Sequence, residues 1–173
     1  PEAVAQDTRA IEEDLNRCFP GDPDGKTHEK QRAAEIYEAV RGTLVLDLHT
    51  TTATPDPFLV LGQITQASKR LARASGLNVA VDQSSYASGG LVQHVDGISI
   101  ECGLQGSSKV IHNAREITLR ILRHEGYLDG EPSVEQSDPT VYEVYDEIER
   151  PSKNAVEVVA DNFAPVSDGE ILY

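Results

Sequence analysis

A histidine and an aspartate stand two residues apart at the end of an apolar run, a pattern that suits metal or acid–base chemistry. The run extends from Thr43 to Leu48, is interrupted by Asp47 and is followed by His49. In an extended chain, side chains two residues apart leave the same face, so these two should meet. A neighbouring carboxylate fixes the tautomer and orientation of a metal-binding imidazole. A hydrogen-bonded histidine closing a strand explains an isolated Asp-x-His equally well.

A glutamate ends a second apolar run in a comparable way. Alternation places Ile98 and Ile100 on one face of a strand and Ser99 and Glu101 on the other. A carboxylate at the end of an interior strand costs free energy unless it is paired, bound to a metal or catalytic. Glu101 is therefore a candidate for chemistry of its own.

Two other segments offer polar side chains for binding. Asn16 and Arg17 stand side by side just before a Phe-Pro-Gly turn. Arginine presents a rigid fork of donors that matches a carboxylate, and asparagine adds a donor and an acceptor. A surface ion pair is the alternative role of Arg17. Tyr86, the only aromatic residue of a polar loop over residues 82–90, is either a donor to a substrate or a surface residue.

Strands and helices that alternate along the chain must position these residues. The spacing predicts an α/β fold, because strand–helix–strand units give a right-handed crossover and a largely parallel, mixed sheet flanked by helices. Residues 140–150 and 155–160 alternate like antiparallel strands, so we expect an α/β domain over residues 1–138 and the start of a small β domain over 139–173. The predicted helices span residues 29–41, 64–74 and 107–124, and the predicted strands span 43–48, 58–61, 78–81 and 98–103.

The composition narrows the possible partners. Twenty-nine acidic against 15 basic residues give a formal charge of −14, which argues against nucleic acid and anionic membranes. Five lysines and ten arginines make the chain poor in lysine, as in proteins of salt-loving organisms, although an ordinary acidic cytosolic protein is the alternative. No apolar run approaches the ~20 residues that span a bilayer. We therefore expect a cytoplasmic protein.

Three motifs in order resemble the succinylglutamate desuccinylase/aspartoacylase family, zinc amidohydrolases with a carboxypeptidase-like α/β fold. The motifs are Asp14-Leu-Asn-Arg-Cys-Phe-Pro-Gly21, Asp47-Leu-His-Thr-Thr51 and Ile100-Glu-Cys-Gly103. The resemblance covers nearly the whole chain, including a β appendage similar to the family's C-terminal domain. It implies one Zn²⁺ per subunit and hydrolysis of the amide bond of a small N-acyl amino acid, of the N-succinylglutamate or N-acetylaspartate type.

The resemblance also implies roles for individual residues. His49 corresponds to a zinc ligand, and Glu101 to the general base that activates water. Arg9 corresponds to an arginine that polarises the scissile carbonyl and stabilises the oxyanion. Asn16 and Arg17 correspond to the pair that binds the substrate carboxylate. This set is chemically coherent, because the positive charge of Arg9 would stabilise the negative charge that develops in the transition state.

The chain also departs from the family pattern. Tyr86 matches the family's loop tyrosine of the substrate pocket only approximately. Some members carry a basic residue for a second carboxylate where Ser88 to Gln93 is uncharged here, which leaves the substrate open. The family's two other zinc ligands come from a His-x-x-Glu motif expected upstream of Pro1, and the family continues beyond Tyr173. We therefore expect a fragment that is inactive alone.

Two alternative functions from other classes remain open. A carboxypeptidase-like zinc peptidase would share the sheet and the metal but would act on peptide C-termini. A metal-free pseudoenzyme or binding module would lack the His-x-x-Glu motif altogether. Whether the protein forms a homo-oligomer is likewise open.

Overall fold

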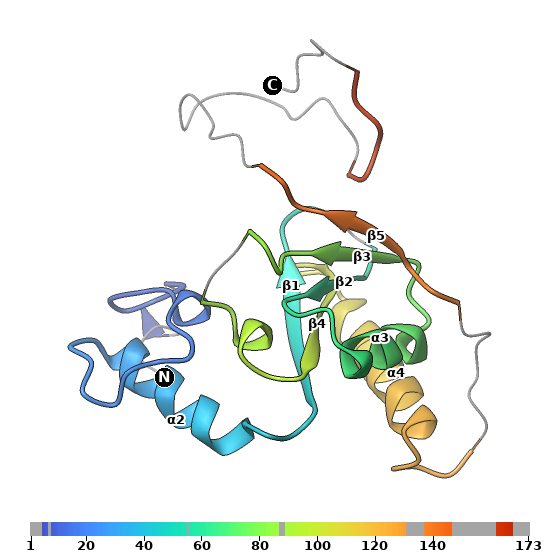
Figure 1. Ribbon diagram of the computed structural model, residues 1–173. Helices are drawn as coiled ribbons and strands as arrows, with labels where there is room; N and C mark the ends of the chain where they lie inside the picture. Colours follow the sequence, from blue (N-terminus) through green and yellow to red (C-terminus); the bar gives the residue numbers. More distant parts are fainter. Residues whose placement is uncertain are drawn as a thin grey trace.

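A five-stranded mixed sheet forms the centre of the molecule (Figure 1). The structure is a computed structural model that describes residues 5–6, 8–54, 56–86, 89–130, 137–146 and 162–167. The strand order is β1-β4-β2-β3-β5. β2 runs antiparallel to β4, whereas the other neighbouring pairs are parallel. The strands are β1 (Val45–Thr51), β2 (Phe58–Leu61), β3 (Val79–Asp82), β4 (Gly97–Leu104) and β5 (Thr140–Glu143).

Helices α3 and α4 bury the main core against the sheet (Figure 1). Ile98, Ile100 and Cys102 of β4 point into this core and are at most 1% exposed. Full burial of an isoleucine side chain contributes about 1.5–3 kcal/mol, which fixes the face that β4 turns inward. Ser99 and Glu101 therefore face the opposite side of the sheet. The helices are α2 (His28–Val40), α3 (Gln66–Ser75) and α4 (Val110–His124).

A second, smaller core joins α2 to two short 3₁₀ helices, η1 (Leu15–Arg17) and η2 (Leu91–Gln93). Its buried residues include Phe19, Ala33 and Val45, so it also includes the start of β1. Figure 1 shows α2 apart from the α3–α4 layer, with β1 between them. In the described ranges, no helix is both long enough and apolar enough to cross a membrane.

The predicted α/β fold is confirmed, and each predicted helix and strand through residue 124 has a counterpart. Ile111 is 78% exposed, because it precedes the buried Ile117 by six positions and so lies about 240° round the helix.

The prediction of antiparallel pairing over residues 140–150 is wrong where the structure describes them. β5 pairs parallel with β3 and extends the same sheet. A four-residue strand presents the same alternation in either direction, so its own sequence does not fix its partner. The prediction for residues 155–160 lies outside the described residues, and the division into domains at residue 139 stays a prediction.

Candidate active site

The pairing of β1 with β4 places His49 beside Glu101. The parallel register sets His49 opposite Glu101 and Asp47 opposite Ser99. Glu101 also lies opposite Phe58 of β2 on its other side. Two residues that are far apart in the sequence thus become neighbours on the face of the sheet that α3 and α4 leave uncovered.

Asp47 orients the imidazole of His49, as the spacing of the two residues predicted. Its Oδ2 lies 2.9 Å from Nε2 of His49, an ion-pair contact whose angle falls outside that of a regular hydrogen bond. The same oxygen accepts a hydrogen bond of 3.3 Å from the Ser99 hydroxyl. The contact with Asp47 raises the pKa of His49, although burial opposes the shift. With Nε2 turned to Asp47, Nδ1 is the ring nitrogen left to bind a ligand.

Glu101 is a partly buried carboxylate in an unusual environment. Burial raises the pKa of Glu101, and the nearby charges of His49 and Arg9 offset only part of that effect. Its Oε2 is buried and has no hydrogen-bond partner within the described part of the chain. A carboxylate with a raised pKa and an unpaired oxygen binds a proton more readily than a free carboxylate does.

A cavity of ≈ 250 Å³ opens above these strand ends. Five of the six predicted site residues line it, namely Arg9, Asn16, Arg17, His49 and Glu101. They come from η1, the segment before it, β1 and β4. A cavity of this volume has room for a small molecule only. The remaining lining residues are Thr50, Thr51, Thr52, Val60, Gly62, Gln83, Gly90, Val92, Gln93, Ser99 and Gln105.

Arg9 reaches the cavity with its guanidinium held by Asp14. Oδ2 of Asp14 lies 2.9 Å from Nε and 2.8 Å from Nη2 of Arg9. This contact leaves Nη1 without a partner among the described residues. The sequence does not predict this pairing, because two residues five positions apart have no fixed spatial relation outside a regular helix.

Asn16 and Arg17 are presented by the 3₁₀ turn η1. Asp14 caps this turn, since its Oδ1 accepts a 3.0 Å hydrogen bond from the backbone N–H of Asn16. Arg17 is exposed and uses Nη1 to donate to the Asn16 carbonyl at 2.8 Å. Its other guanidinium nitrogens have no partner in the described part of the structure. These donors are therefore available to an anionic ligand.

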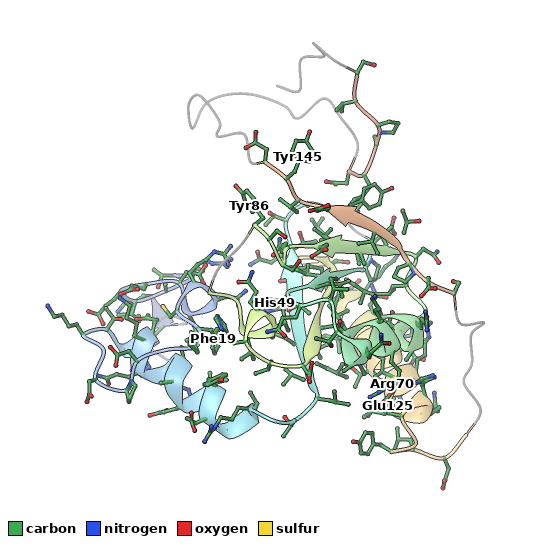
Figure 2. All side chains as sticks on the ribbon, in the orientation of Figure 1. Phe19, His49, Arg70, Tyr86, Glu125 and Tyr145 are labelled. Carbon is green, nitrogen blue, oxygen red and sulfur yellow. The ribbon has the colours of Figure 1, made fainter. Side chains whose placement is uncertain are left out.

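Tyr86 is not among the residues that line this cavity. It is 42% exposed, at the end of the described part of its loop, and lies well apart from His49 in Figure 2. Its role in substrate binding stays a prediction.

Three glutamines of the cavity wall were missed by the sequence analysis. Gln83 follows β3, Gln105 follows β4 and Gln93 ends η2. The amide nitrogen of Gln93 donates to the Gln83 carbonyl at 3.1 Å, and that of Gln63 donates to the Gln93 carbonyl at 2.6 Å. The spacing of glutamines in a sequence does not indicate a binding site. Gln83 and Gln105 nevertheless follow strands directly, and because ligands bind at the carboxyl ends of strands, these positions could have identified them.

The described residues offer only part of a metal site. They include no group of three or more His, Cys, Asp or Glu side chains that could hold a metal ion. His49 fits as a single ligand, because its ring is oriented by Asp47 as metal-binding imidazoles are. A catalytic zinc site takes three protein ligands, so the described residues alone do not complete one.

The fold and the cavity together describe an α/β protein with an imidazole and a carboxylate at adjacent strand ends and two arginines that line the same cavity. Residues 1–124 match the model of the succinylglutamate desuccinylase/aspartoacylase catalytic domain. The chain therefore belongs to this family of acyl-amino-acid hydrolases.

Solved structures share the fold at low sequence identity. The succinylglutamate desuccinylase of Vibrio parahaemolyticus is 21% identical, with a TM-score of 0.68 over 99% of this chain and 58% of its own. A succinylglutamate desuccinylase/aspartoacylase of Rhodobacter sphaeroides is 22% identical, with a TM-score of 0.63 over 83% of this chain and 49% of its own. The ectoine utilization protein EutE (DoeB) of Ruegeria pomeroyi, with product bound, is 21% identical, with a TM-score of 0.60 over 84% of this chain and 49% of its own.

The chain thus spans about half the length of the solved relatives that it matches. A search of the curated proteins found no significant match.

Proposed function

We propose that this chain is part of a cytoplasmic enzyme that hydrolyses the amide bond of an N-acyl amino acid, of the N-succinylglutamate or N-acetylaspartate type. The observation that carries the proposal is the register of β1 and β4, which sets His49 beside Glu101 at a cavity that Arg9, Asn16 and Arg17 also line. Membership of the family supports the same reaction.

Each residue contributes a separate step. Arg17 and Asn16 bind the carboxylate of the substrate, because their free donors face the cavity without an internal partner. Glu101 accepts a proton from a water molecule while the water oxygen attacks the amide carbon. Nη1 of Arg9 stabilises the negative charge that develops on the carbonyl oxygen. Glu101 then returns the proton to the leaving nitrogen, so that a carboxylic acid and a free amine are released.

The proposed cofactor is one zinc ion, for which His49 is a ligand through Nδ1. Two further ligands would come from outside the described residues. When bound, zinc supplies a Lewis acid that polarises the carbonyl and lowers the pKa of water. Asp47 prepares His49 for this role by holding the other ring nitrogen.

The test is a substrate panel assayed with the full-length, zinc-loaded protein. Release of free amine is measured from N-succinylglutamate, N-acetylaspartate, other N-acyl amino acids and blocked dipeptides. We expect turnover of at least one acylated amino acid and little turnover of the dipeptides. Preference for blocked dipeptides would identify a peptidase instead, and no turnover by metal-replete protein would contradict the proposed hydrolysis.

A further inference from the structure

The segment that carries Arg9, Asn16 and Arg17 to the cavity has little regular structure. Residues 8–14 form no helix or strand, and the 3₁₀ turn η1 occupies only three residues after them. All three side chains nevertheless converge on one cavity. We call residues 9–17 the binding arm. Asp14 links Arg9 to η1 within the arm, and contacts with other elements hold the residues between them.

One such contact is the carboxylate of Glu29, which lies in the first turn of α2 and is only 6% exposed. Its Oε1 accepts hydrogen bonds from the backbone N–H groups of Ile11 at 2.9 Å and Glu12 at 3.3 Å. Burial alone would raise the pKa of Glu29, but these backbone donors outweigh burial and the pKa lies below its ordinary value. The carboxylate is therefore charged and holds two successive residues of the binding arm.

The residues on either side of Glu29 reinforce this hold. The backbone N–H of His28 donates to Oε2 of Glu12 at 3.0 Å. Nζ of Lys30 lies 3.1 Å from Oε1 of Glu13. The first turn of α2 thus binds three successive residues of the arm, and Glu29 is the only buried member of this set.

Hydrogen bonds satisfy only part of this carboxylate. Its Oε2 is buried and has no hydrogen-bond partner within the residues that the structure describes. A buried, partly satisfied carboxylate usually contributes less to folding than an apolar side chain of similar volume. An apolar side chain at position 29 would therefore fill the same space but could not hold residues 11 and 12.

We propose that Glu29 is a positioning residue for the active site. Glu29 does not line the cavity, but it fixes residues 11 and 12. These residues connect Arg9 to Asn16 and Arg17, so Glu29 sets the position of Arg9 relative to the other two. This inference rests on the proposed function, because it assumes that the two ends of the arm act on one substrate.

The experiment compares Glu29→Leu and Glu29→Gln with the wild type, in full-length zinc-loaded protein. Leucine keeps the volume but removes both acceptors, whereas glutamine keeps one acceptor oxygen. With an acylated amino acid that the wild type hydrolyses, we expect Glu29→Leu to lower kcat/KM by about 10- to 100-fold, the usual effect of a misplaced binding group. Much of this loss should appear as a higher KM, and Glu29→Gln should recover most of it.

The matched control is Glu35→Leu, which removes a carboxylate from the exposed face of the same helix, where Glu35 pairs with Arg32 at 2.7 Å. It should leave KM unchanged. A purely structural role of Glu29 would lower the folded fraction, and with it the apparent kcat, at constant KM. Unchanged KM in folded Glu29→Leu protein would therefore overturn the proposal.

Hydrogen exchange provides a readout that does not depend on activity. The amide hydrogens of Ile11 and Glu12 should be protected in the wild type and should exchange faster in Glu29→Leu, whereas Glu35→Leu should resemble the wild type. Equal exchange in Glu29→Leu and wild type would overturn the proposal. If the wild type hydrolyses no acylated amino acid, the proposed function fails, and the exchange result still decides whether Glu29 holds the arm.

Discussion

At the scale of single residues, the contact between Asp47 and His49 leads to a prediction about pH. The contact with Asp47 is the main cause of the raised pKa of His49. Asp47→Asn removes the negative charge, so the protonated imidazole loses its partner and the pKa of His49 should fall. We expect this decrease in an NMR titration of the His49 ring in metal-free protein.

The control for this prediction is Asp56→Asn, which removes an exposed carboxylate that does not line the cavity. It should leave the titration of His49 unchanged. An equal titration of His49 in the Asp47→Asn variant and the wild type would show that Asp47 does not hold the ring.

The sequence predicted the chemistry of single residues better than their partners. The two-residue spacing placed Asp47 and His49 on one face, and the structure confirms the contact at 2.9 Å. The adjacency of His49 and Glu101 was not predictable from spacing, because it depends on which strands pair and in what register. The pairing of Arg9 with one carboxylate oxygen of Asp14 was missed for a similar reason, since it forms in a segment without regular geometry.

At the scale of elements, the loop before η2 packs against η1 through a glycine. The backbone N–H of Phe19 donates to the Gly89 carbonyl at 3.0 Å. Gly89 has φ +88°, and a Cβ there would lie 2.3 Å from the carbonyl oxygen of Arg17. We expect Gly89→Ala to lower the free energy of unfolding by more than the ~1–2 kcal/mol of left-handed strain alone and to raise the substrate KM, because the collision displaces Arg17.

The matched control for this variant is Gly106→Ala, because Gly106 has a similar φ of +81° but no atom within 4 Å of the added methyl group. Urea unfolding of both variants separates backbone strain, which they share, from the collision, which only Gly89→Ala suffers. Equal losses of stability and an unchanged KM would mean that this contact does not hold Arg17 in place.

Elements with strong local signals were predicted well, as was the largely parallel sheet, but the pairing of the last strand was not. Local residues determine both ends of helix α3. Thr65 and Ser68 form a capping box at its start, and Gly76 takes the left-handed conformation after its last turn. β5 was recognised as a strand, but its parallel pairing with β3 was missed because pairing depends on residues far away in the sequence.

At the scale of the whole molecule, the family assignment rests on residues 1–124, which include every predicted site residue. The chain spans about half the length of the solved relatives. Activity is therefore predicted for the full-length protein. The formal charge of −14 is the basis of the predicted adaptation to high salt, which stays a prediction.

The central claim is that Glu101 transfers the proton during amide hydrolysis, and kcat of the Glu101→Gln variant tests it most directly. The substitution preserves the shape of the side chain but removes the basic oxygen. We expect full-length Glu101→Gln protein to keep its fold and its zinc content while kcat falls by at least ~10²-fold, the lower range for loss of general acid–base catalysis. A variant that holds zinc and turns over the substrate at nearly the wild-type rate would contradict the account.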